Sequence, residues 1–484
     1  MGTIAAQAQQ SAFDSAIKAA SDLIWGWGMI GMILAVGIYL TIRTRFVQIR
    51  HLGRALKYTV KNEKNAEGET SSFGALCTAL SATIGTGNIV GVATAVTAGG
   101  PGALLWMVTA AFFGMATKYA EGLLAVKYRR ETRPGRFLGG PFCYIEMGLG
   151  KSRKWLAECF AFAGAMAGVM GIGTIVQVNG ITSAVNGIVD PTAEHTAFCI
   201  GDYRITWAAI VTGLIVTVGA AAVIIGGIRR IAKVSGVVVP FMAATYILFA
   251  VIILAVNIRR LPDAILLIFR SAFDPSAVHG AISGLMIKTV IRMGVGRGIF
   301  SNEAGLGSAP IAAASAKTRD PARQGLVSMI GTFIDTIVIC TMTGLTIIVT
   351  GAWDPSVTGA ALTGVDVTAY AWRHGLPFGR GFSSAMLAMC LAFFAFTTIL
   401  GWNHYGEKCV EYLSGGNRRA IRAYRFMYIA AVLVGPYLTA SAVWNIADIF
   451  NGLMALPNLT ALIMLAKTVS RETEALDRRL RSRR

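Results

Sequence analysis

Long apolar runs separated by short polar stretches recur along the whole chain. Most of these runs reach the ~20 residues that a helix needs to cross the hydrocarbon core of a bilayer. The pattern predicts an all-α polytopic membrane protein with eleven transmembrane helices. These helices are expected at about 23–42, 71–98, 103–127, 156–188, 205–227, 234–256, 277–315, 325–350, 381–406, 424–441 and 444–467.

Clusters of lysine and arginine follow every second predicted span, so that all strongly basic loops fall on one side of the membrane. Basic loops are retained on the cytoplasmic side. The N-terminus is therefore expected outside and the C-terminus in the cytoplasm. The chain then divides into an outside lead with the first helix and a basic loop (1–70), a five-helix set (71–257), an outside surface segment (258–276), a second five-helix set (277–467) and a basic cytoplasmic tail (468–484).

Two of the predicted spans are interrupted by glycine. The second span contains Gly85-Thr86-Gly87-Asn88, and the seventh contains Gly294-Val295-Gly296-Arg297-Gly298. Each glycine costs about 1 kcal/mol in a helix interior, and an opened helix is tolerated in a bilayer only around a polar cavity. Because each is the first span of a five-helix set, the pattern predicts an inverted-repeat transporter with broken helices 2 and 7. The alternative is that the glycines only permit close helix packing.

Composition agrees with a membrane protein. Of the 484 residues, 54% are hydrophobic and 14% are charged, against about 25% charged residues in soluble domains. The net charge of +19 is explained by the cytoplasmic loops, so no nucleic-acid partner is expected. The chain has seven scattered cysteines and five histidines, with no CxxC, HExxH or GxSxG motif. Metal, disulfide and enzymatic roles are therefore not expected. No cleavable signal pattern is present, so the first span is expected to direct insertion.

Several motifs resemble the alanine/glycine:cation symporter family. They are 81–92, Gly99-Gly100-Pro101-Gly102, 114–121, the block Arg297-Gly298-Ile299-Phe300-Ser301-Asn302-Glu303-Ala304-Gly305-Leu306-Gly307-Ser308-Ala309-Pro310, 399–403 and 405–407. The likeness covers essentially the whole chain, and Ala313 departs from it where many members have histidine. The resemblance implies a fold similar to the bacterial leucine transporter, with one helix in front of a 5+5 inverted repeat. It also implies sodium-coupled uptake of alanine and/or glycine across a bacterial cytoplasmic (inner) membrane, without a cofactor.

The opened backbone of the second span is expected to bind the carboxylate of an amino acid. Thr86 and Gly87 can donate backbone N–H groups, aided by the positive end of the following half-helix. Asn88 offers an amide to the substrate or to an ion, or it only caps that half-helix. Gln177 lies on the span that resembles the pocket-lining helix of this family. Its amide accepts from the substrate ammonium, or it bridges two helices.

Three further residues are expected to shape the pocket. Trp402 resembles a wall that limits the size of the substrate side chain, and the alternative is an interfacial belt tryptophan. Met293 and Gly294, at the expected break of the seventh span, would close the apolar end of the pocket.

The resemblance also indicates a sodium site. Gly85-Thr86-Gly87-Asn88 aligns without gaps on the Gly-Leu-Gly-Asn motif of the leucine transporter. This alignment makes the backbone carbonyls of Ser81 and Ile84 sodium ligands, together with the adjacent hydroxyls of Thr397 and Thr398. Carbonyl and hydroxyl oxygens are the hard ligands that such a cation prefers. The alternative is that the threonines bond only to their own helix.

Ionisable residues within the spans complete the expectations. Arg297, Glu303 and Asp335 either gate, pair or relay protons, or they pair structurally near the cytoplasmic half, because buried charge in a membrane is expensive. Lys118 and Glu121 are expected to be a snorkelling pair at a helix end. A proton-coupled symporter and, more distantly, a channel remain alternatives to sodium symport. The choice between alanine and glycine, the preferred enantiomer, the stoichiometry and the oligomeric state stay open.

Overall fold

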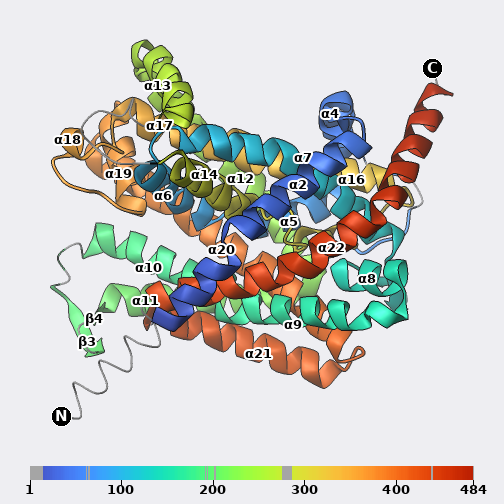
Figure 1. The fold of residues 1–484 in the computed structure, drawn as a ribbon. Coiled ribbons are helices and arrows are strands. Elements are labelled where there is room, and N and C mark those ends of the chain that lie inside the picture. The colour runs from blue at the N-terminus through green and yellow to red at the C-terminus, as the bar shows by residue number, and fades with distance from the viewer. Residues whose placement is uncertain are drawn as a thin grey trace.

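The computed structural model describes residues 15–482 except 62, 64–65, 134, 191, 193, 201–202, 275–285 and 438–439. Most helices run side by side along one direction of the molecule (Figure 1). The hairpin of β3 (Thr196–Ile200) and β4 (Tyr203–Thr206) lies at one end of this bundle, together with α18 (Pro355–Thr358) and α19 (Val365–Gly375). The opposite end carries α4 (Leu52–Val60), α8 (Pro141–Leu149) and the end of α22 (Ala440–Arg481). The short elements therefore lie at two opposite ends of the bundle, as expected if each end faces one side of a membrane.

Within the described residues, eight helices are long and apolar enough to cross a membrane, or nine if one bent pair counts as a span. The nine agree with the predicted spans except 277–315 and 424–441, so the predicted count of eleven is not reached on this criterion. The two shortfalls have a local cause. The helix α14 (Ile287–Asn302) has 16 residues and α21 (Arg418–Val434) has 17, so both are shorter than the 18 residues required, and both also carry several basic residues. The unbroken spans include α2 (Trp27–Arg43), α7 (Ala103–Lys127), α11 (Trp207–Ile224), α12 (Gly227–Val256) and α20 (Arg380–Leu413).

The break predicted in the second span is confirmed. Helix α5 (Ser72–Thr83) ends at the extended residues Ile84 and Gly85, and a 3₁₀ turn, η1 (Thr86–Asn88), precedes α6 (Val90–Gly99). The two halves are bent by 62°. The weak helix propensity of Gly85-Thr86-Gly87 therefore opens the backbone at the place where the sequence predicts it.

The break predicted at 294–298 is wrong, because α14 runs through these glycines without interruption. A Cβ on Gly294 would lie 2.2 Å from the carbonyl oxygen of Ala103, so this glycine lets α14 approach α7 closely. Helix α14 instead ends at Glu303, which adopts a left-handed conformation (φ 54°). Gly305 and Gly307 also have positive φ, a conformation that glycine adopts without strain. The chain then enters the short helix α15 (Ala309–Ala313), with Pro310 in its first turn.

Two further spans contain irregular backbone near their centres. The fourth is divided into α9 (Lys154–Met170) and α10 (Ile175–Val189), so that Gln177 lies in the first turn of α10. The eighth consists of α16 (Pro321–Thr332), the π-helical segment η5 (Phe333–Cys340) and α17 (Thr341–Thr350). Insertions of π-helix are frequent at functional sites, and η5 contains Asp335.

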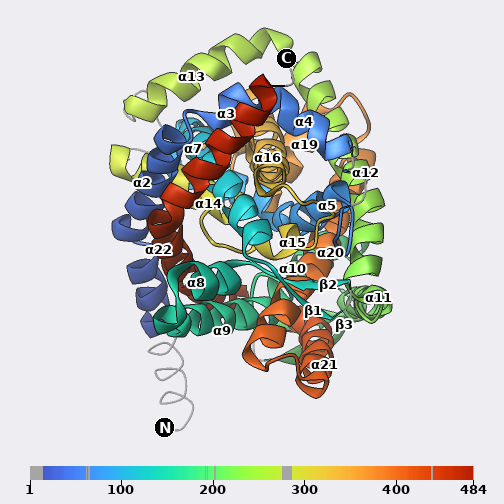
Figure 2. The same ribbon diagram turned by 90° about the vertical axis from the view of Figure 1, so that its right-hand side faces the viewer.

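The connections contain structure that hydrophobic periodicity does not reveal. A hairpin of β1 (Arg130–Arg133) and β2 (Arg136–Leu138) leads into α8. Helix α13 (Leu261–Phe273) lies at the edge of the bundle, within the predicted surface segment 258–276 (Figure 2). The predicted lead up to residue 14, the start of the seventh span (277–285) and residues 483–484 of the tail lie outside the described residues.

Candidate functional site

A small central cavity lies where the two breaks meet α10 and α20. Its volume is about 10 Å³, close to the space that one water molecule needs. The lining residues come from α5, η1, α10, α14 and α20 and from the segments that follow α5, α9 and α14. They are Ala82, Thr83, Gly85, Gly87, Ile172, Gln177, Phe300, Glu303 and Thr398. The structure thus brings three predicted site residues, Gly87, Gln177 and Thr398, to one cavity.

Gln177 directs an unpaired acceptor toward the first break. Its Nε2 donates to the carbonyl of Ile172 at 3.0 Å, whereas its Oε1 is buried without a hydrogen-bond partner. A Cβ at residue 85 would lie 3.4 Å from this oxygen. Because glycine has no Cβ, Gln177 Oε1 directly faces the backbone of Gly85. The hydroxyl of Thr86 is also buried and unpaired. Unpaired buried polar groups are costly, and at this position they are available to a polar ligand.

The predicted sodium ligands gather where α5 ends against α20. The hydroxyl of Thr398 lies 3.3 Å from the carbonyl oxygen of Ile84 and 3.0 Å from that of Phe394. Thr397 Oγ1 is also 3.0 Å from the Phe394 carbonyl, but it contacts the sulfur of Met242 on its other side. These groups are neutral oxygens of the kind that bind a hard cation.

The sequence predicts the backbone carbonyl of Ser81 as a ligand, and this stays a prediction. The side chain of Ser81 packs against Gly401 of α20, and its hydroxyl donates to the carbonyl of Thr78 within α5. The carbonyl of Phe394 was not anticipated, although both threonines bond back to it within their own helix. A threonine in a span usually bonds back to a carbonyl three or four residues earlier on its own helix. The adjacent pair Thr397-Thr398 could therefore have pointed to the carbonyl of Phe394.

Asn88 points away from the cavity and joins the first break to η5 of the eighth span. Its Oδ1 accepts from the N–H of Gly85 at 2.9 Å, and its Nδ2 donates to Asp335 Oδ1 at 2.8 Å. The other carboxylate oxygen of Asp335 accepts from Ser301 of α14 at 2.9 Å and from Thr336 at 2.7 Å. Asn88 thus closes the first break as a local cap, and Asp335 ties that break to α14. Neither Ser301 nor this arrangement was predicted.

Glu303 presents a carboxylate to the central cavity. Its Oε1 accepts from Trp402 Nε1 at 3.1 Å, and Ser308 donates to its other oxygen. Trp402 is fully buried, so it is not an interfacial belt residue, and it stands behind Glu303. This contact orients the carboxylate at the point where α14 ends.

Lys118 and Glu121 do not snorkel, and that interpretation is corrected. Both are buried, with 2% and 0% of their surface exposed. Glu121 Oε1 accepts from the backbone N–H of Gly305 at 3.1 Å and from Asn458 at 2.7 Å. The pair lies on the part of α7 that packs inside the bundle, where Glu121 holds the open backbone of the second break.

A larger cavity of about 510 Å³ lies beside the middle and C-terminal part of α14. This outer cavity is lined by Lys18, Ser21, Asp22, Trp25, Ile30, Arg292, Met293, Gly296, Arg297, Phe300, Asn445 and Asp448. Met293 therefore lies on the outer cavity, and Gly294 packs on α7, so neither lines the central cavity. Arg297 also lies here, apart from the contacts of Glu303 and Asp335. Phe300 lines both cavities and separates them.

Comparison with known proteins identifies the family. The model of the sodium:alanine symporter family matches residues 10–484. The chain is 51% identical to an uncharacterized transporter of Haemophilus influenzae over 97% of both chains. It is 47% identical to the sodium/alanine symporter AgcS of Methanococcus maripaludis, over 96% of this chain and 97% of the relative.

The fold has a match among solved structures as well. A crystal structure of MhsT in complex with L-phenylalanine aligns with a TM-score of 0.56 at 11% identity, covering 84% of this chain and 99% of that one. This likeness concerns the fold, whereas the full-length matches concern ancestry. Together they establish that the chain is a multi-pass membrane transport protein that belongs to the sodium:alanine symporter family.

Proposed function

We propose that this protein couples the uptake of alanine and/or glycine to sodium entry across a bacterial inner membrane. The observation that carries the proposal is the pair of neighbouring sites at the first break. Unpaired Gln177 Oε1 faces the backbone at Gly85, and the neutral oxygens of Ile84 and Thr398 lie directly beside it. The relative named as a sodium/alanine symporter supports both the ion and the amino acid.

The substrate is proposed to bind between the two breaks. Thr86 and Gly87 are the first residues of a helical turn, where N–H groups lack a partner within the helix and the dipole favours an anion. These N–H groups would bind the carboxylate. The ammonium would lie between Gln177 Oε1 and the carboxylate of Glu303, which can accept further hydrogen bonds. The central cavity has room for about one water molecule, so the two breaks would have to open for the substrate to enter.

Sodium is proposed to bind at the C-terminal end of α5. Its ligands would be the carbonyls of Ser81 and Ile84 and the hydroxyls of Thr397 and Thr398, joined by the carbonyl of Phe394. The C-terminal end of a helix carries partial negative charge, and opened carbonyls at half-helix ends bind coupling ions in transporters of this architecture. Because Gly85 follows Ile84 directly, occupation of the ion site would fix the backbone that the substrate requires.

Transport is proposed to follow alternating access of the two five-helix sets, 71–257 and 277–467, around this site. The outer cavity would be the approach from outside, with Phe300 between it and the central cavity. The N-terminus would lie outside and the C-terminus in the cytoplasm. The substrate would then lie close to both breaks. Its binding would therefore couple the movements of the two five-helix sets.

Uptake into proteoliposomes tests the proposal and separates it from its alternatives. With pH equal on both sides, an inward sodium gradient should drive accumulation of labelled alanine, and unlabelled alanine or glycine should compete. Accumulation driven equally by a pH gradient in the absence of sodium would replace sodium with protons. Non-saturable flux without exchange of labelled for unlabelled substrate would indicate a channel.

A further inference from the structure

A third cavity, at the end of the helix that carries Thr398, is lined mainly by arginine. Its volume is about 500 Å³, and it lies where α20 ends and α21 begins. We call it the arginine cavity. Its lining consists of Arg136, Glu407, Glu411, Arg418, Ile421, Arg422 and Arg425. Four cations and two carboxylates leave this cavity with a net charge of +2.

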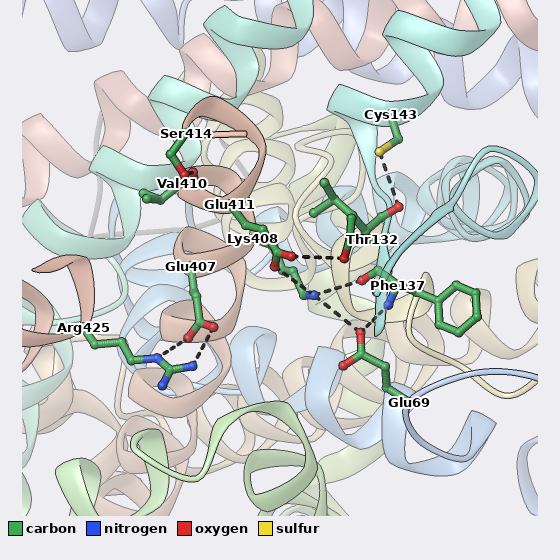
Figure 3. A network of polar contacts seen from close by, with 11 residues as sticks. Glu69, Thr132, Phe137, Cys143, Glu407, Lys408, Val410, Glu411, Ser414 and Arg425 are labelled. Carbon is green, nitrogen blue, oxygen red and sulfur yellow. Dashed lines mark hydrogen bonds and ion pairs between the residues drawn. The ribbon is translucent and has the colours of Figure 1, made fainter. Parts of the chain in front are cut away.

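The two carboxylates of the arginine cavity already form ion pairs within the protein. Glu407 accepts a two-point contact from Arg425, with Nε at 2.6 Å and an Nη at 2.7 Å (Figure 3). Glu411 lies 3.2 Å from the ammonium of Lys408, which also contacts Glu69 at 3.4 Å and donates to the Phe137 carbonyl at 2.9 Å. Glu407 and Glu411 are therefore bound to other basic groups.

The remaining arginines have no such partner. Arg136, Arg418 and Arg422 form no ion pair with any residue that the structure describes. Basic loops alone account for arginines on this face, but they do not account for three guanidinium groups converging on one cavity. The first turn of α21 adds the positive end of a helix dipole. The arrangement has the charge and hydrogen-bond donors of a site for an anionic phosphate group, which arginine binds in a two-point contact.

The surroundings of the arginine cavity indicate a lipid as the source of that phosphate. On α21, directly after the lining residue Arg425, Phe426 and Met427 are 72% and 51% exposed, and Leu413 at the end of α20 is 42% exposed. Exposed apolar side chains of spanning helices face acyl chains, and basic pockets at the cytoplasmic ends of such helices bind anionic headgroups. We propose that the arginine cavity binds the headgroup of an anionic phospholipid, with its acyl chains along the outer face of α21.

This inference does not depend on which solute is transported. It does predict a connection to the transport site, because Glu69 lies just before α5 and Lys408 lies on the same helix as Thr398. A bound headgroup would hold the end of α20 and the entry to α5 in their present arrangement. Bound lipid should therefore raise the thermal midpoint of the protein.

Lipid binding to the purified full-length protein tests this proposal. Native mass spectrometry would count phosphatidylglycerol bound in neutral detergent, with phosphatidylcholine as the uncharged comparison. The double variant Arg418→Gln/Arg422→Gln should weaken phosphatidylglycerol binding by at least about tenfold. Arg419→Gln is the matched control, because Arg419 lies on the same helical turn but does not line the cavity. An equal thermal midpoint with phosphatidylcholine would show that all variants fold.

Three results would overturn the proposal. The double variant could bind phosphatidylglycerol as tightly as the unmodified protein, or Arg419→Gln could weaken binding as much as the double variant. Either result would remove the arginine cavity as the site. If millimolar inorganic phosphate displaced the lipid and raised the thermal midpoint as much as phosphatidylglycerol does, the site would be one for a free anion and not for a lipid headgroup.

Discussion

The two breaks that meet at the central cavity differ in how they open the helix and in the groups they expose. The break after α5 is short and neutral, and its polar groups are backbone amides, hydroxyls and one asparagine. The break after α14 is longer and ionic. It contains Glu303 in a left-handed conformation and is held by Glu121 and Asn458. A neutral break suits a cation that needs only oxygens, whereas a carboxylate suits the ammonium of an amino acid.

The comparison also shows that a glycine does not break a helix by itself. Gly294 and Gly298 are four residues apart and place the backbone of α14 against α7, a spacing typical of close packing between membrane helices. Gly305 and Gly307 open the backbone because their φ angles are positive. The two pairs of glycines differ because of what lies beside them. Helix α7 packs against Gly294 and Gly298, which keeps α14 helical there.

Removal of the connection between the breaks should have the largest effect. Asp335→Ala removes the carboxylate acceptor of Ser301 and Thr336 and one acceptor of Asn88, whose Nδ2 keeps the backbone carbonyl of residue 335 at 3.2 Å. Each such loss costs about 1–3 kcal/mol, so alanine uptake should fall by more than about 100-fold and the thermal midpoint should drop. Asp335→Asn, which keeps one acceptor, should be intermediate. Uptake and a thermal midpoint close to the unmodified values for Asp335→Ala would show that the breaks are not coupled through this residue.

Neutralisation of the ionic break should mainly weaken substrate binding. Glu303→Gln keeps the size of the side chain but removes the charge that is proposed to face the ammonium. A hydrogen bond to a charged group contributes about 1.5–3 kcal/mol, so the alanine concentration for half-maximal uptake should rise at least about tenfold. Glu158→Gln, on the exposed face of α9, is the matched control and should have no effect. An unchanged alanine dependence in Glu303→Gln would exclude the carboxylate from the substrate site.

The packing role of the glycines in α14 predicts a smaller effect, on stability. Gly294→Ala places a methyl group 2.2 Å from a backbone oxygen of α7, and such overpacking costs about 1–3 kcal/mol. Gly296→Ala meets nothing closer than 3.9 Å and should be neutral or slightly stabilising. Thermal unfolding in detergent measures both. A Gly294→Ala variant as stable as the unmodified protein would show that α14 does not pack this closely on α7.

Much of this architecture could be predicted because membrane spans and basic loops impose strong patterns on a sequence. The first break was located correctly, since Gly85 and Gly87 interrupt an otherwise apolar span. The second was misplaced because packing glycines and hinge glycines are identical in sequence until their neighbours are known. Pro310 was the available signal, since proline is favoured in the first turn of a new helix.

The candidate site was predicted only in part, for a similar reason. Ile84, Gln177 and Thr398 could be identified because each is tied to a recognisable motif or lies within a span. The direction of a side chain depends on tertiary contacts, so the sequence leaves open whether Asn88 faces the substrate, faces an ion or caps the half-helix, and it does not predict the contact with Asp335. Met293 and Gly294 followed from the misplaced break.

The neutral break and α20 are proposed to bind the coupling ion together. The most direct test is a sodium titration of alanine uptake in proteoliposomes, comparing Thr398→Val with Thr397→Val. Thr398 contacts Ile84, so its replacement should raise the half-maximal sodium concentration by about tenfold, the cost of about one lost ligand interaction. Thr397→Val should shift the curve less, because that hydroxyl also faces Met242. Identical sodium curves for the unmodified protein and Thr398→Val would show that sodium does not bind between the first break and α20.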